Sequence, residues 1–389
     1  MFLRPIFDPT VPAHTRVKRR HWLIRPYQSY GPWVGQSFKI RLDVPFGHMF
    51  KQKLKLPMLL ICVGLFVLLI AETGPAVIAS RVYDVGLGFL LLIVISGIRH
   101  LFRTFAWYFA IERQARRVRF RDLFGMRIAG EAITDLTILG PLLGETVKGI
   151  ALSRQVTAEQ SASSIVVENL AYSFAVLLFV VSGLVLFITE FPLHSTIRTA
   201  ILMTLAGLLL AGALVVLIVK KRYRLVSRSL DGLNRLNLRW VDRLRDGREQ
   251  VARFEENVYN FWHVHRAAAA LMLMLEILSI CAGVVEAWII LGLTVHRTSL
   301  FAAFMVETVN RVVNLIFAFV PMRIGVDEGG AALVLRTVGF GAVEGVSLAI
   351  IRKIRTLFWV ALGLVLLSHY SMVSKKETQK GPSVITTSK

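Results

Sequence analysis

The chain has 389 residues, of which 55% are apolar and 18% charged, and its formal net charge is +21. A soluble domain carries roughly 25% charged residues, so this composition excludes an ordinary soluble protein and favours apolar helices joined by basic loops. A nucleic-acid-binding protein would also be basic, but that class does not explain the long apolar segments, and no nucleic-acid partner is expected. Cys62 and Cys281 form neither a redox motif nor a zinc-ligand spacing, so we expect no metal and no cofactor.

Residues 1–55 form a basic leader that precedes the first apolar segment. They contain 11 lysines and arginines against two acidic residues, with scattered proline and aromatic residues. No secretory signal pattern is visible in them. We therefore expect a cytoplasmic N-terminal segment.

Eight apolar segments follow, and a membrane span needs about 20 such residues. The candidates are residues 56–71, 85–111, 163–188, 199–219, 267–294, 298–320, 326–341 and 346–370. Basic stretches at 112–122 and 220–266 belong in the cytoplasm by the positive-inside rule, and the sparsely charged connections near 72–81, 189–198 and 295–297 belong outside.

This sidedness implies that two segments do not cross the bilayer. Residues 125–155 and 298–341 must each enter and leave on one side, as re-entrant hairpins with tips near Gly140-Pro141 and Pro321. The predicted fold is an all-α polytopic membrane protein with six full transmembrane helices and two opposed broken-helix hairpins, a pattern that suggests inverted repeats. Hydropathy alone would give seven or eight spans.

The predicted organisation has a membrane half on each side of a basic linker. Residues 56–219 form the first half and 267–370 the second, followed by a tail at 371–389. The linker, 220–266, has apolar residues near helical spacing with arginines on its other faces. It is interpreted as amphipathic helices on the anionic inner membrane surface, or alternatively as a solvated connection between the halves.

Charged residues inside the predicted hairpins are the main functional candidates, because a charge in hydrocarbon costs several kcal/mol. One stripe is Arg127, Glu131 and Asp135; the other is Glu307, Asn310, Arg311 and Asn314. Each stripe lies on one helix face. Arg127 and Glu131 stand 14 and 10 residues before the first hairpin's proline, and Glu307 and Arg311 stand likewise before the second. Their swapped signs would suit reciprocal pairing between the hairpins. Supporting charges are expected at Glu168 and Arg352.

The two tips combine helix-breaking residues with charges. Pro141 and Gly144 in the first hairpin, and Pro321 and Gly325 in the second, are expected to break the helix at membrane depth. Beside these breaks stand the residues to which we assign head-group binding or ion coupling: Glu145, Lys148, Arg311, Arg323, Asp327 and Glu328. The alternative is that these charges pair with one another and only stabilise the fold.

Four short stretches stand out: Pro141-x-x-Gly-Glu-x-x-Lys148, Pro321-x-x-x-Gly-x-x-Glu328, Arg103–Tyr108 and Val166-Val167-Glu168-Asn169. They resemble motifs of the lysylphosphatidylglycerol synthase transmembrane, or flippase-like, family. Asn169 stands where the family usually has a basic residue, and Met322 and Arg323 stand where glycine-like residues are typical. The resemblance covers roughly residues 55 to 370. It implies a bacterial or archaeal inner-membrane protein that moves polar lipids between leaflets.

Larger members of that family carry a C-terminal aminoacyl-transferase domain. About 19 residues follow the last predicted span here, so no synthase activity is expected. The favoured function is flippase-like transport of phospholipids or prenyl-linked lipids without a nucleotide-hydrolysing motif. Lys148, Arg311 and Arg323 would hold phosphate, and Glu145, Asp327 and Glu328 an amine or a proton. The alternatives are an ion-coupled carrier of a soluble solute, a membrane-embedded lipid-modifying enzyme, and a lipid-binding scaffold.

Overall fold

The computed structural model describes residues 83–112, 118–137, 139–191, 195–221, 248–317, 320–323 and 325–379, with isolated positions at 64, 67 and 76. Within these ranges all regular secondary structure is helical. The predicted leader 1–55 lies outside the described residues, as do most of the first predicted span and the linker residues 222–247.

Four long apolar helices in the described part reach the length and hydropathy of a membrane span, which makes this a multi-pass membrane protein. They are α4 (Gly88–Ala110), α7 (Ala158–Glu190), α8 (Ser195–Lys221) and α12 (Arg266–Val295). At about 1.5 Å per residue, each is long enough for a hydrocarbon core about 30 Å thick. They correspond to four of the predicted spans. Another long helix, α15 (Ala342–Gln379), covers the last predicted span but is not among these four.

Each predicted hairpin is a pair of shorter helices. The first consists of α5 (Phe120–Leu136) and α6 (Gly140–Leu152), which pack against each other. The second consists of α13 (Leu300–Ile316) and α14 (Val326–Thr337), joined through the single 3-10 turn η3 (Pro321–Arg323). None of the four helices exceeds about 26 Å, so each is shorter than the hydrocarbon core. Entry and return on one side of the membrane stays a prediction.

The helix breaks lie close to the predicted positions, with one correction. The first break falls between the end of α5 at Leu136 and the start of α6 at Gly140. Pro141 lies in the first turn of α6, where its missing N–H costs nothing. Gly144, predicted as part of the break, lies inside α6. A side chain there would collide with Thr134 and Gly130 of α5, so this glycine serves close helix packing.

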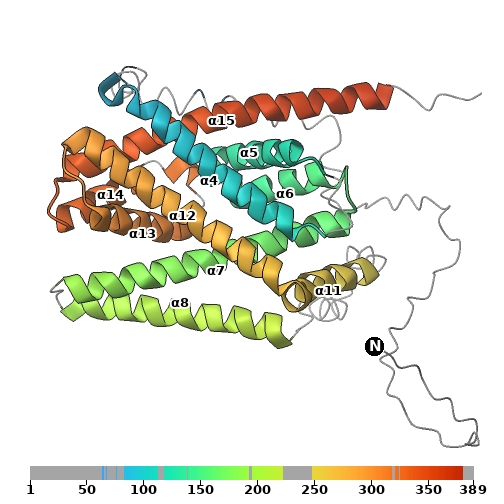
Figure 1. The fold of residues 1–389 in the computed structure, drawn as a ribbon, viewed down its shortest axis with the longest axis horizontal. Helices are drawn as coiled ribbons and strands as arrows, with labels where there is room; N and C mark the ends of the chain where they lie inside the picture. Colours follow the sequence, from blue (N-terminus) through green and yellow to red (C-terminus); the bar gives the residue numbers. More distant parts are fainter. Residues whose placement is uncertain are drawn as a thin grey trace, which may run out of the picture. The chain divides into compact units, whose positions relative to one another are not determined.

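The helices pack around a core that involves both membrane halves. α4 runs along α12, α15 packs on α5 and α14, and α8 lies beside α7 (Figure 1). Trp107 of α4, Leu123 of α5 and Met272 of α12 are buried in one apolar cluster. A second cluster joins α4 and α12 to α13, α14 and α15.

The described end of the linker is helix α11 (Arg248–Val264), whose apolar face packs on protein. Val258 and Phe261 are buried in the cluster around Trp107. α11 contacts α7 and α12. This contact holds the last turns of the linker against α7 and α12. Contact of the rest of the linker with the membrane surface stays a prediction.

Candidate functional site

Charged side chains from seven helices gather inside the bundle and form two ion-pair networks. The first network is centred on Glu168 of α7, whose side chain is fully buried. Its carboxylate accepts from Arg127 of α5 at 2.6 Å and from Arg103 of α4 at 3.4 Å, and the Lys148 ammonium of α6 lies 3.8 Å away. Trp107 lies against these cations, with Arg127 and Lys148 5.8 and 5.4 Å from its ring. Such cation–π contact is a partial substitute for water.

Two further acids complete the first network. Glu131 of α5 contacts His100 at 2.9 Å, Arg127 at 3.1 Å and Arg103 at 3.3 Å. Glu276 of α12 is fully buried and lies 3.5 Å from the Arg103 guanidinium. One arginine therefore interacts with acids from three different helices, α5, α7 and α12, and links both membrane halves.

The second network is centred on Glu307 of α13. Its carboxylate accepts from Arg311 at 2.5 Å and from Arg352 of α15 at 2.8 Å. Gly283 of α12 permits this arrangement, because a Cβ there would lie 2.7 Å from a Glu307 oxygen. The same Arg352 nitrogen donates to the Gly283 carbonyl at 2.9 Å.

A second buried acid, Glu286 of α12, belongs to this network. It pairs with Arg99 of α4 at 3.1 Å, with Arg355 of α15 and, at 4.0 Å, with Arg352. Four arginines (Arg99, Arg311, Arg352 and Arg355) thus face two acids, Glu286 and Glu307. The second network therefore carries an excess of positive charge.

Tyr172 of α7 joins the two networks. Its hydroxyl accepts a hydrogen bond from Arg311 at 2.8 Å. The Arg103 guanidinium lies 4.2 Å from its ring centroid. One aromatic side chain therefore contacts a cation from each network.

The reciprocal pairing predicted between the hairpins is wrong. Arg127 pairs with Glu131 of its own helix and with Glu168, and Glu307 pairs with Arg311 of its own helix and with Arg352. The i,i+4 spacing puts each opposite charge one turn away, and a third helix supplies the remaining partner.

The charged residues beside the hairpin tips are also paired. Glu145 lies 2.7 Å from Lys148, and Arg323 lies 3.3 Å from Asp327. Glu328 pairs with Lys353 of α15 through one oxygen, and with the other it accepts from the Gly325 backbone N–H at 2.8 Å, capping α14. Both oxygens of Glu328 thus have structural partners.

The second tip has an unusual backbone. Met322 and Arg323 have φ of 44° and 48°, and Gly325 has φ of 82°. Glycine adopts this left-handed region freely, whereas other residues pay roughly 1–2 kcal/mol each. The conformation gives a physical reason for the glycine-like residues typical of positions 322 and 323 in the family that the sequence resembles. Here the chain keeps a cation at Arg323.

A large cavity of about 1080 Å³ adjoins both networks. Its lining includes charged residues from both hairpins and α4, among them Glu131, Glu145, Lys148, Arg311 and Arg323. It also includes many apolar residues of α7 and α8, among them Val176, Leu177, Leu208, Ala211 and Val215. The cavity is therefore amphiphilic.

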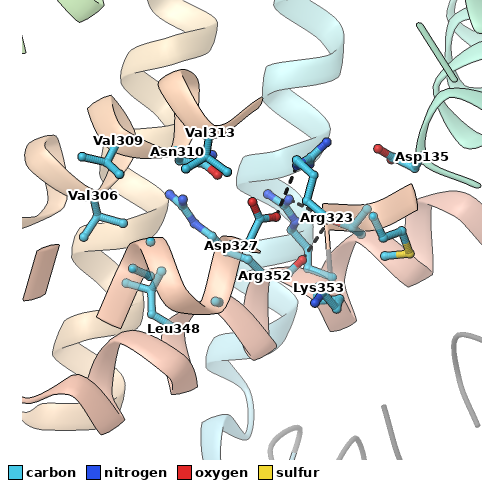
Figure 2. A pocket seen from close by; sticks show the side chains of 16 residues that line it. Asp135, Val306, Val309, Asn310, Val313, Arg323, Asp327, Leu348, Arg352 and Lys353 are labelled. Atoms are coloured by element: carbon cyan, nitrogen blue, oxygen red, sulfur yellow. Dashed lines mark hydrogen bonds and ion pairs between the residues drawn. The ribbon is translucent and has the colours of Figure 1, made fainter. Parts of the chain in front are cut away.

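A smaller pocket of about 70 Å³ lies between the first hairpin, the second hairpin and α15 (Figure 2). Arg352 and Lys353 line it from α15, and Asn310 and Asp327 from the second hairpin. Asp135, Arg323, Arg355 and Thr356 line both this pocket and the large cavity. The two spaces are thus adjacent.

Residues 56–363 match the family model of the lysylphosphatidylglycerol synthase TM region. The chain belongs to this family. The family is membrane-embedded and linked to lipid handling, and the match includes both hairpins and α4, α7, α8 and α12. No curated protein and no solved structure matches the chain.

In this member of the lysylphosphatidylglycerol synthase TM family, the structure brings most of the sequence-predicted site residues together. Lys148, Glu145, Arg311, Arg323 and Asn314 line the large cavity. Asn310, Asp327 and Arg352 line the small pocket. Glu328 and the supporting Glu168 and Glu307 contact lining residues without appearing in either wall.

Sequence reasoning missed several members of the site. Tyr172 and His100 carry no charge signal that distinguishes them from other polar residues in apolar helices. Lys353 follows directly after Arg352, and that adjacent cation was a usable signal. Asp135 was recognised as part of a stripe, but its position at the junction of the two cavities depends on how α5 packs on the second hairpin and α15.

Proposed function

We propose that this chain moves polar lipids between the two leaflets of the membrane, as a flippase-like transporter and not as an enzyme. The observation that carries the proposal is the amphiphilic cavity, about 1080 Å³ in volume, whose lining combines charged residues from both hairpins with apolar residues of α7 and α8. Membership of a membrane family linked to lipid handling supports it.

The cavity would hold the lipid by its two chemical parts. Cations such as Lys148 and Arg311 favour charge-assisted hydrogen bonds to a phosphate oxygen. The apolar wall of α7 and α8 is suited to the first carbons of the acyl chains, while the rest stay in the bilayer. A soluble solute would gain nothing from this wall, which disfavours the carrier alternative.

The charged wall addresses the main energetic obstacle to lipid crossing. An ionised group in hydrocarbon costs several kcal/mol or more, and a path lined by opposite charges replaces part of the lost hydration. Phospholipids and prenyl-linked phosphates both meet this requirement. Resemblance to the family suggests a bacterial inner membrane. Both termini would lie in the cytoplasm, because the basic stretches favour that side.

A matched pair of substitutions on α8 tests the proposal. Ala211 lines the cavity, whereas Ala213 is exposed on the same helix and does not line it. Ala211→Trp fills part of the cavity and should slow the movement of tail-labelled phosphatidylglycerol across proteoliposomes, measured by dithionite quenching. Ala213→Trp should behave as the unmodified protein.

The result has clear alternatives. Equal lipid movement in both tryptophan variants, or no movement above empty liposomes with the unmodified protein, would refute the transport proposal. Mass spectrometry of lipid that co-purifies with the protein names the class to be assayed. Conversion of added lipid into a new product would indicate an enzyme instead.

A further inference from the structure

Asp135 is a carboxylate without an ion-pair or hydrogen-bond partner among the described residues, at the junction of the two cavities. It lies in the last turn of α5, lines both spaces and is half-buried. The other acids lining these spaces, such as Glu131 and Asp327, have cationic partners. This isolation is unusual because buried charges are normally paired.

The groups around Asp135 pull its ionisation in opposite directions. Burial acts on the Asp135 carboxylate, together with the charges of Arg323, Glu131, Arg355 and Asp327. The two arginines favour the carboxylate. The two acids, the partial burial and the negative end of the α5 dipole disfavour it. In Figure 2, Asp135 approaches the pocket from the first hairpin and Arg323 and Asp327 from the second.

Other charged groups face the same space from neighbouring elements. Lys148 and Glu145 of α6 are paired with each other, and His100 of α4 is paired with Glu131. Arg352 and Lys353 of α15 line the small pocket and pair with Glu307 and Glu328. The cations that favour the Asp135 carboxylate are therefore Arg323 and Arg355.

These two arginines can bind a further anion. Within the described part of the chain, Arg323 forms one ion pair, to Asp327 at 3.3 Å, and a quarter of its side chain is exposed. Arg355 donates to Glu286 and Thr356, but its Nε is buried and has no acceptor. It also belongs to the network with more arginines than acids. A phosphate at the junction would therefore meet unused positive charge.

Phosphate binding there would alter the balance at Asp135. An anion on Arg323 and Arg355 neutralises the charges that favour the carboxylate and adds a negative charge beside it. A proton then binds to the Asp135 oxygen. The pocket volume of about 70 Å³ exceeds the minimum of roughly 10–15 Å³ that a cavity needs to hold a water, so water there can supply the proton.

We propose that Asp135 takes up one proton from water when a phosphate diester of a lipid head group binds Arg323 and Arg355, and returns it when the phosphate leaves. The inference rests on the proposed function for the identity of the anion. The proton taken up by Asp135 would be the ion coupled to lipid movement. A metal ion is a poor alternative, because it needs several oxygen ligands and the described residues contain no group of three that could hold one.

Calorimetric titration tests the linkage directly. Dihexanoyl phosphatidylglycerol is titrated into the full-length protein in buffers of different ionisation enthalpy, which gives the protons bound per lipid. We expect close to one proton for the unmodified protein and none for Asp135→Asn. Affinity should fall about tenfold per pH unit over the range where only the lipid-free protein is ionised at Asp135, and Asp135→Asn should remove this slope.

Controls separate the linkage from loss of fold. Glu190→Gln changes an exposed acid at the end of α7 and should keep the proton uptake, and Asp135→Glu should restore it. Equal proton uptake by Asp135→Asn and the unmodified protein would overturn the proposal. So would lipid binding to the unmodified protein without proton uptake, or a failure of the unmodified protein to bind the lipid.

A second ligand distinguishes this failure from failure of the proposed function. Glycerophosphoglycerol carries the same phosphate diester without acyl chains. Tighter binding of the dihexanoyl lipid supports a lipid substrate. Equal binding of both ligands, each with one proton, would keep the Asp135 linkage but replace lipid transport by transport of a soluble phosphate diester.

Discussion

The contact between α5 and α6 gives a sharp test of the packing described above. Gly144 faces α5, and a Cβ there would overlap the Thr134 hydroxyl and lie 2.6 Å from the Gly130 carbonyl oxygen. Ordinary contact begins near 3.4 Å, so Gly144→Ala must separate the helices by about 0.8 Å. Overpacking of this kind costs roughly 1–3 kcal/mol.

Gly207 of α8 is the matched control, because nothing lies within 4 Å of a Cβ placed there. Both substitutions gain the same helix propensity of up to about 1 kcal/mol, so their difference isolates the packing cost. The unfolding entropy of about 2.1 cal/mol/K per residue gives roughly 1 °C per kcal/mol for a chain of 389 residues. Gly144→Ala should therefore unfold about 1–4 °C below Gly207→Ala. The assay is thermal unfolding of the detergent-solubilised protein, monitored as the loss of monodispersity with temperature.

The outcome also bears on the site. Glu145 follows Gly144 directly, and Lys148 lies one turn later, 3.8 Å from Glu168. Separation of α6 from α5 should therefore weaken lipid movement together with stability. If Gly144→Ala and Gly207→Ala unfold at the same temperature, the close approach of α5 and α6 is incorrect.

Two further substitutions test the ion-pair networks. Glu168→Gln removes the acid that Arg127 and two other cations share, and breaking a buried pair costs about 3–5 kcal/mol. The control is Glu159→Gln on the same helix, which breaks an exposed pair with Arg253. It should cost at most about 1 kcal/mol. Equal unfolding temperatures for these two variants would contradict the burial of Glu168. Tyr172→Phe deprives Arg311 of an acceptor and should cost about 1–3 kcal/mol, whereas an unchanged unfolding temperature would mean that water satisfies this guanidinium.

Much of the local structure follows from the sequence. Proline at 141 and 321 and glycine at 325 mark the two breaks because of their own backbone chemistry, and the breaks lie within a few residues of them. Long apolar segments predicted α4, α7, α8 and α12 because length and hydropathy are local properties. Gly144 misled the prediction, since a glycine inside a helix and one at its end look alike in sequence.

The charge stripes were recognised, but their partners were not. Periodicity places Arg127 and Glu307 on a helix face without saying which helix that face meets. Arg127 finds Glu168 of α7, and Glu307 finds Arg352 of α15. The sequence also did not predict that Asp135 lacks an ion-pair partner among the described residues, because pairing depends on distances between helices far apart in the chain.

The sequence by itself determined that this is a helical membrane protein with two interrupted helices and buried charge, because hydropathy, helix breaks and i,i+4 spacing act over a few residues. Only the tertiary structure decided that these charges form two networks joined at Tyr172, and that Asp135, between two cavities, has no ion-pair partner among the described residues. Those facts arise from the packing of α4, α5, α7, α12 and α15, whose contacts join residues as much as 263 positions apart.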